Sequence, residues 1–398
     1  MKKIKTIISR VRHIGHIGLI GLICLVSCSK DDGSVERDVA GIAIGGVRSY
    51  ATYFGESDLQ TRSGEGITRA WDIPSGYTAY EDGAQPIAIA FTEDGEEPKK
   101  GFFFKVDDKW RTNIDDLEQQ RYYLYGFIPN LPVIKYGITD YDGGADDADK
   151  NAYYSMGAIM TLEDVPTVMP TDFCVVIGAK DGTDAETVSG LRQGDFAYVA
   201  KAFSGEPGSK VDGGNYVFLL FDHLYAALRI NMKVHADYAE IRTIKLKSLQ
   251  LSTQAGETKT TKKTTINIRL SANDVSASPI EELTFTPDGD PIDGGIEFWS
   301  NAAGTTLTTA FQPFIGHFMP DGVTKLVLTS VYDVYDRNGN LIRQDCKATN
   351  TMVLSELILG QTETERGKRY TINMTIMPTY LYMLSEPDVE NPVLIDEE

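Results

Sequence analysis

The feature that most constrains the fold is a strict alternation of apolar and polar residues in the second half of the chain. Every even-numbered position from Leu224 to Val234 is apolar, and the odd-numbered positions become polar from Arg229 onward. Successive side chains of an extended strand point to opposite faces, so this period of two predicts one long strand with a single buried face. The same alternation recurs at 244–247 and at 370–376.

A turn signal joins two further extended runs. The first begins at Leu326 and reaches Asn338-Gly339, and the second begins at Leu341. Asn-Gly between extended runs is typical of a β-hairpin, whose tight turn needs positive φ at both central residues. The residues from Asp336 onward are only superficially similar to a calcium-binding loop, because Leu341 stands where such a loop needs glycine.

Helical periodicity is scarce, and only residues 113–121 are compatible with a short helix. Tyr (20), Phe (16) and Gly (37) are plentiful, which favours short strands joined by tight turns. We therefore expect an all-β chain of two β-sandwiches in tandem, 69–210 and 211–398, with the boundary in the turn-rich segment 205–214. No short repeat indicates a propeller or a solenoid.

The first 27 residues have the pattern of a secretory signal peptide. A basic start is followed by an apolar run over 14–26, which is shorter than the roughly 20 residues that a membrane-spanning helix needs. The run ends in Leu25-Val26-Ser27-Cys28, which resembles a bacterial lipobox. This resemblance implies that Cys28 is lipidated and becomes the first residue of the mature protein. The alternative is a plain secretory signal with a chance cysteine.

The residues after Cys28 are charged. Lys30, Asp31 and Asp32 resemble the surface-export signal of certain Gram-negative lipoproteins, and the alternative is a solvated tether. Acyl chains on Cys28 would anchor the chain stably, because each buried methylene contributes about 0.8 kcal/mol. We expect an outer membrane lipoprotein that is displayed at the cell surface.

Charge and motifs exclude several functions. A formal net charge of −19 makes the chain a poor partner for nucleic acid. The sequence has no nucleophile elbow, zinc-protease motif, phosphate loop or dinucleotide fingerprint. We expect no enzymatic activity and no cofactor. A surface glycan-processing enzyme stays a minor alternative, since its two carboxylates could meet only in the folded chain.

The remaining reactive residues have structural interpretations. His223 follows Asp222 at the start of the long strand, which is typical of a structural hydrogen bond. Acidic residues crowd 140–149, but their spacing matches no EF-hand, so solvation is preferred to calcium binding. Cys174 and Cys346 are too few for a disulfide scaffold, and we expect two buried thiols. No Cys/His spacing indicates zinc, so we expect no metal.

Three stretches, taken in order, resemble the fimbrillin family of type V pilins and related surface lipoproteins. They are 67–77, which contains Thr68-Arg69-Ala70-Trp71, then 221–231 with its continuation to 252, and 367–376 with its continuation to 392. The resemblance implies two transthyretin-like β-sandwich domains and assembly at the cell surface. In polymerising members a protease cuts after an arginine and removes the first strand, and the C-terminal strand of another subunit takes its place.

Mapped onto this chain, the removable strand is Val47–Phe54, within a tether over 28–68. The expected cut follows Arg69, with Arg62 as second choice and Arg48 as third. The alternative is that these are ordinary exposed arginines. The expected donor strand contains Tyr380, Tyr382 and Leu384, or the later Leu394. Alternatively the tail packs on its own domain, and the acidic end 396–398 leaves the donor role open.

The resemblance implies a non-enzymatic structural subunit of a surface pilus, joined to other pilin subunits by strand addition. The alternative is a lipid-anchored, non-polymerising adhesin, or a pilus anchor or tip subunit, that binds glycan or host protein. Exposed aromatic side chains in loops, such as Trp110 or Trp299, would favour that alternative.

Overall fold

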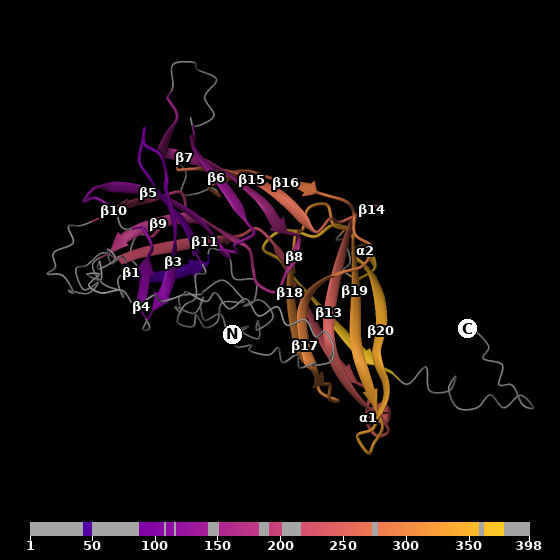
Figure 1. Ribbon diagram of the computed structural model, residues 1–398. Coiled ribbons are helices and arrows are strands. Elements are labelled where there is room, and N and C mark those ends of the chain that lie inside the picture. The colour runs from indigo at the N-terminus through magenta and orange to yellow at the C-terminus, as the bar shows by residue number, and fades with distance from the viewer. Residues whose placement is uncertain are drawn as a thin grey trace, which may run out of the picture. The chain divides into compact units, whose positions relative to one another are not determined.

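The computed structural model describes residues 43–49, 87–106, 109–114, 117–141, 151–182, 191–200, 216–272, 278–357 and 362–377. The chain divides into two compact units, Met1–Arg37 and Asp38–Glu398, and every described residue belongs to the second. The described residues form four β-sheets and two four-residue helices (Figure 1). This confirms the expected all-β class.

The largest sheet has eight strands. Its hydrogen-bonded order is β1-β11-β9-β5-β2-β3-β4, and β10 pairs with β5. The strands are β1 (Ala43–Ser49), β2 (Ile87–Thr92), β3 (Lys99–Val106), β4 (Lys109–Thr112), β5 (Arg121–Ile128), β9 (Cys174–Gly182), β10 (Ala197–Val199) and β11 (Tyr216–His223). Its central strands β2 and β5 consist almost entirely of buried residues, so both faces of this sheet are covered.

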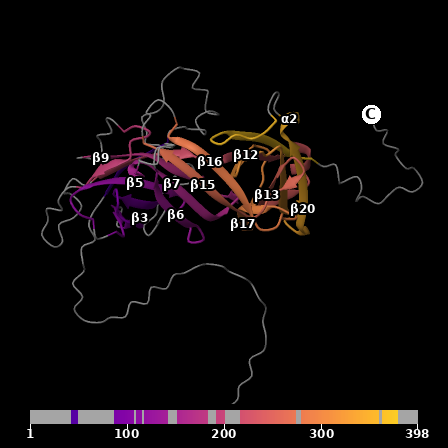
Figure 2. The same ribbon diagram turned by 90° about the horizontal axis from the view of Figure 1, so that it is seen from above.

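A four-stranded sheet, the β15 sheet, shares one hydrophobic core with the eight-stranded sheet. Its strands lie side by side in the order β16-β15-β7-β6 (Figure 1 and Figure 2). They are β6 (Lys135–Tyr141), β7 (Tyr153–Pro166), β15 (Lys263–Ser271) and β16 (Ile280–Asp288). Met160 and Ile268 from this sheet and Phe127 and Val175 from the eight-stranded sheet belong to the same cluster of buried side chains. The two sheets therefore form a β-sandwich.

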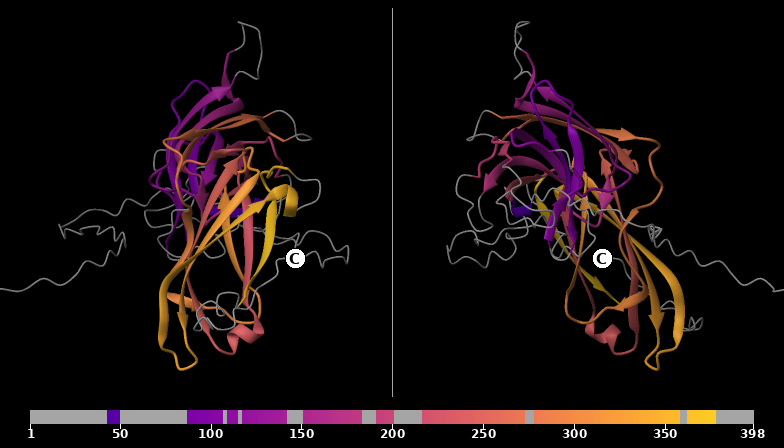
Figure 3. Two further views of the ribbon diagram at one scale, coloured as in Figure 1. Left: turned by 90° about the vertical axis from the view of Figure 1, so that its right-hand side faces the viewer. Right: turned by 60° about the vertical axis from the view of Figure 1, so that its left-hand side comes forward.

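Two further sheets form a second core. The first, the β12 sheet, has the order β21-β12-β18-β8, with β8 (Val168–Met169), β12 (Ala226–Val234), β18 (Gln312–Phe318) and β21 (Arg369–Ile376). The five-stranded sheet has the order β14-β13-β19-β20, and β17 pairs with β13. Its strands are β13 (Thr243–Ala255), β14 (Thr258–Lys259), β17 (Ile296–Thr306), β19 (Lys325–Tyr335) and β20 (Leu341–Val353). Figure 3 shows its long strands β19 and β20 in orange and yellow.

The alternating pattern of 224–234 is confirmed as a strand with one buried face. Leu228, Ile230 and Met232 of β12 lie in the second core, whereas Arg229 and Asn231 are half-buried. The strand begins at Ala226, two residues later than the pattern predicts, and β11 precedes it with only Leu224 and Tyr225 between them. The segment 216–234 therefore contributes one strand to the eight-stranded sheet and the next to the β12 sheet.

The predicted hairpin is confirmed, but its turn differs from the prediction. β19 and β20 pair in antiparallel fashion on either side of Asp336–Asn340. Gly339 has φ +81°, and Asn338 is not among the residues with positive φ. The Asp336 carboxylate accepts hydrogen bonds from the backbone N–H groups of Asn338 and Asn340, both at 2.8 Å. A side chain thus stabilises the loop where the two-residue turn was expected.

The predicted helix at 113–121 is wrong for the residues that the structure describes there. Residues 113–114 and 117–120 are not helical, and Ile114 and Leu117 are buried in a cluster on the second face of the eight-stranded sheet. The two short helices, α1 (Ala236–Ala239) and α2 (Leu354–Leu357), were not predicted. Ile114 and Leu117 have helical spacing, but they pack against the sheet from non-helical backbone. Tertiary packing routinely overrides a weak helix propensity.

The domain boundary at 205–214 stays a prediction, and the sheets cross it. β11 follows this segment in sequence but pairs with β9, which precedes it. β15 likewise pairs with β7. Strand partners that are distant in sequence are a normal feature of antiparallel sandwiches with Greek-key connections.

Candidate functional site

The first candidate site is the edge that β1 covers. β1 is the first strand that the structure describes, and it pairs with β11 in parallel, with Val47 opposite Leu219 and Ser49 opposite Phe221. Its Cα atoms also approach those of β4, the strand at the other end of this sheet (Figure 1). β1 therefore lies between two strands that would otherwise be edges. It overlaps the expected removable strand only at 47–49, and residues 50–54 lie outside the described residues.

β11 is buried on both faces. Val217, Leu219 and Phe221 are fully buried in the cluster on one face of the eight-stranded sheet. Leu220 lies in the core on the opposite face. A strand whose side chains are this well covered is held by packing as well as by hydrogen bonds, so β11 does not depend on β1 alone for its position.

The expected processing sites differ in their relation to β1. Arg48 lies within β1, opposite Leu220, so a cut there would divide the strand. Arg62 and Arg69 lie outside the described residues, after β1 and before β2, which begins at Ile87. A cut after either of them would separate β1 from β2 without dividing a described strand.

The C-terminal end of the described chain has a second parallel pair. β21 pairs with β12 in parallel, with Tyr370 opposite Leu228 and Ile376 opposite Val234. The pairings of the other described strands are antiparallel. The expected donor residues Tyr380, Tyr382, Leu384 and Leu394 lie outside the described residues, which end at Met377.

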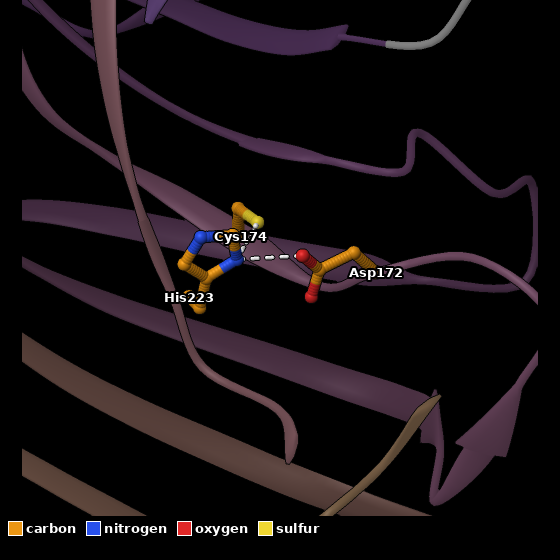
Figure 4. A group of neighbouring side chains, drawn as sticks. All are labelled: Asp172, Cys174 and His223. Carbon is orange, nitrogen blue, oxygen red and sulfur yellow. Dashed lines mark hydrogen bonds and ion pairs between the residues drawn. The ribbon is translucent and has the colours of Figure 1, made fainter. Parts of the chain in front are cut away.

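The second candidate site is a buried cluster of Asp172, Cys174 and His223 (Figure 4). One oxygen of the Asp172 carboxylate lies 2.6 Å from Nδ1 of His223, and Sγ of Cys174 lies 3.4 Å from the same nitrogen. Cys174 begins β9 and His223 ends β11, and the two residues are paired across the ladder. Among the described residues, this group places three possible metal-ligand atoms within 4.8 Å of one another.

Other polar side chains surround this cluster. Asp222 Oδ1 accepts a hydrogen bond from the backbone N–H of His223, and Asp222 Oδ2 accepts one from Arg366. His317, from β18, is buried and donates from Nδ1 to the carbonyl oxygen of Pro170 at 3.2 Å. Burial lowers the pKa of His317, and the negative charge of Asp172 opposes that shift.

The geometry of the cluster does not suit nucleophilic catalysis. A Cys–His–Asp triad needs the thiol on one imidazole nitrogen and the carboxylate on the other, so that the ring can pass a proton between them. Here both groups face Nδ1. Burial, followed by the nearby Asp172 charge, raises the pKa of Cys174, and the thiolate is the reactive form. The cluster can stabilise the fold or bind an ion.

The sequence predicted the hydrogen bond of His223 but not its partner. The side chain contacts Asp172, 51 residues away, whereas the adjacent Asp222 bonds to the backbone. Cys174 is a buried free thiol as expected, and Cys346 is free but only half-buried. No local pattern relates residues 172 and 223, because their proximity results from the β9–β11 register.

Trp299, the one tryptophan whose side chain is among the described residues, gives no support to a glycan-binding surface. Trp299 lies in β17, not in a loop, and it packs against the second core with its ring 4.7 Å from that of Phe314. Trp110 lies in β4, and its side chain is outside the described residues.

The residues of the export signal are outside the part of the chain that the structure describes. These are Cys28, Lys30, Asp31 and Asp32, so lipidation and surface export stay predictions. Within the described part, no helix has the length and apolar character that crossing a membrane requires.

Of the comparisons with known proteins, the one with solved structures gives matches. No family model matches the sequence, and no curated protein does. A "putative cell adhesion protein" from Bacteroides uniformis is 11% identical over 77% of this chain and 91% of that chain, with a TM-score of 0.35. A fimbrial protein from Bacteroides ovatus is 9% identical over 85% of this chain and 50% of that chain, with a TM-score of 0.28.

A third similar structure is a "putative adhesin" from Bacteroides ovatus. It is 8% identical over 75% of this chain and 82% of that chain, with a TM-score of 0.28.

Proposed function

We propose that this chain is a structural subunit of a surface pilus. It is exported as a lipoprotein through Cys28 and assembled by strand exchange after β1 is removed by proteolysis. One observation supports this most directly: β1, the first described strand, ends the hydrogen-bonded order of its sheet, pairs in parallel with β11 and approaches β4 without a described pairing.

β1 can leave the sheet without opening a hairpin, because it is parallel to its partner strand β11. Parallel partners cannot be joined by a tight turn, so no hairpin connects β1 to β11. Its departure breaks main-chain hydrogen bonds to one strand and exposes the edge of β11 beside the apolar cluster of Val217 and Leu219. A strand from a second subunit restores those hydrogen bonds and covers the exposed side chains.

The positions of the candidate arginines agree with this route. Arg62 and Arg69 follow β1 and precede β2, so cleavage after either releases β1 and leaves the remaining described strands in one chain. The donor is the tail containing Tyr380, Tyr382, Leu384 and Leu394, which follows β21. The partners are other subunits of the same kind, and the location is the outer surface of the cell.

The test is loss of polymer when both arginines are removed. Surface material sheared from cells that express the wild-type chain should contain a ladder of assembled subunits on a gel without heating. The double variant Arg62→Ala, Arg69→Ala should give no ladder while the amount of membrane-anchored chain stays the same. Arg337→Ala is the matched control, because this exposed arginine lies in the β19–β20 loop.

The outcomes separate the two functions. An undiminished ladder from the double variant would contradict cleavage at these arginines. A wild-type chain that stays entirely membrane-anchored, with nothing in the sheared fraction, would instead identify a non-polymerising anchor or adhesin.

A further inference from the structure

We propose that Asp172, Cys174 and His223 bind one zinc ion. This site is independent of pilus assembly, and its ligands come from two distant segments of the sequence. None of the sequence spacings that mark common zinc motifs is present, which is why the sequence did not reveal it.

The strand register fixes the relative positions of Cys174 and His223 in the absence of an ion. Cys174 at the start of β9 is paired with His223 at the end of β11. Asp172 precedes Cys174 by two residues, and all three residues are 0–2% exposed. A set of ligands held by a buried ladder loses little conformational entropy on binding an ion.

The distances are close to those of tetrahedral zinc. Bond lengths of about 2.3 Å to sulfur and about 2.0 Å to nitrogen or oxygen give S···N separations of about 3.5 Å and N···O separations of about 3.3 Å. The observed Sγ···Nδ1 distance is 3.4 Å. The observed Nδ1···Oδ2 distance of 2.6 Å is a hydrogen bond, so the carboxylate must withdraw by less than about 1 Å.

The proton balance of binding is simple. Zinc displaces the thiol proton of Cys174 to solvent and takes the place of the proton on Nδ1 of His223, so that the bound ring is neutral and carries its one proton on Nε2. The ion, one carboxylate and one thiolate together carry no net charge. A buried site that ends neutral avoids the large cost of an uncompensated charge in the interior.

The three protein ligands leave one position of the tetrahedron open. At zinc sites with three protein ligands a water molecule commonly occupies the fourth position.

The ligand types select the metal. Thiolate and imidazole ligands favour zinc, whereas calcium and magnesium prefer carboxylates, carbonyls and water. Because the side chains are buried, the ion is taken up as β9 and β11 pair, and its binding energy contributes to folding. Zinc would therefore stabilise the junction between β11 and β12.

The test uses the full chain purified in detergent. Its zinc content is measured by elemental analysis, and the chain is then unfolded with chelator and refolded with one equivalent of Co²⁺. We expect about one zinc per chain in the wild type, and a thiolate-to-cobalt charge-transfer band after refolding. Cys174→Ser should lose at least 90% of both signals. Cys346→Ser is the matched control and should keep both, since Cys346 is the other free thiol of the described chain.

Two results would overturn the proposal. One is a wild-type chain that holds no zinc as purified and shows no thiolate–cobalt band after refolding. The other is a Cys174→Ser chain with the wild-type zinc content and band. If Cys174→Ser does not fold, Asp172→Asn replaces it in the comparison, and the wild-type result still decides whether an ion binds.

Discussion

Arg366 donates a hydrogen bond to Asp222, with 2.8 Å between Nη1 and Oδ2, across 144 residues of sequence. The same nitrogen donates to the backbone carbonyl of His223 at 3.0 Å. Asp222 is on β11, the strand that β1 covers, and Arg366 lies just before β21. This ion pair therefore joins the start of the last described strand to the strand at which exchange is proposed.

Replacing Arg366 with Met should destabilise the fold. The Asp222 side chain is only 6% exposed, so removing the arginine leaves a nearly buried carboxylate without its cation. Because Arg366 itself is 33% exposed, we expect a loss of about 1–3 kcal/mol in the free energy of unfolding, measured by urea denaturation. Lys325→Met is the control, since its partner Glu257 is 97% exposed. Equal losses in the two variants would contradict the assigned role.

Gly126→Ala tests the packing between β5 and β2. A Cβ atom at Gly126 would lie 2.3 Å from the backbone oxygen of Ala88 and 3.0 Å from Cδ1 of Ile89. The strands must shift to admit it, so we expect a loss of about 1–3 kcal/mol in thermal or urea unfolding. Gly137→Ala, in β6, has no atom within 4 Å of the added Cβ and should change stability by less than about 1 kcal/mol. Similar effects at the two glycines would contradict the packing described here.

The burial of Tyr136 should lower the free energy of unfolding at alkaline pH. Burial raises the pKa of Tyr136 to about 12. The unfolded chain releases this proton near pH 10 and the folded chain retains it, so stability falls as pH rises from about 10 to about 12. Tyr136→Phe should remove about 2–3 kcal/mol of that pH-dependent loss, measured as the difference in unfolding free energy between pH 9 and pH 12. An unchanged pH dependence in Tyr136→Phe would contradict the assignment.

Cys28→Ser tests the lipid anchor. Only a thiol forms the thioether to diacylglycerol, so cells fed an alkyne-labelled fatty acid should label the wild-type chain and Cys346→Ser but not Cys28→Ser. Fractionation should then find the unlabelled chain away from the outer membrane. Full labelling of Cys28→Ser would refute lipidation at this residue.

Elements with a strong local pattern were predictable from the sequence. The alternation at 224–234 and 370–376 identified β12 and β21, and Asn338-Gly339 identified the β19–β20 hairpin. In each case neighbouring residues determine the feature. The strands need one buried face, and the hairpin needs one residue with positive φ.

Long-range relationships were not predictable. The contact of His223 with Asp172 and the pairing of β15 with β7 depend on sheet register between distant segments. The turn around Asp336 was also missed in detail, because a side-chain carboxylate stabilises a loop that local sequence alone assigned to Asn-Gly. The contact of His223 and the pairing of β15 are tertiary effects, which local periodicity does not encode, whereas the Asp336 turn is local side-chain chemistry.

The most direct test of the central proposal is the mature N-terminus of the chain on cells. Mass spectrometry would compare protein from intact outer membranes with protein from sheared surface material. We predict acylated Cys28 in the membrane fraction, and Ala70 or Ser63 as the first residue of the sheared, assembled fraction. Assembled material that begins at Cys28 and still contains β1 would contradict strand exchange.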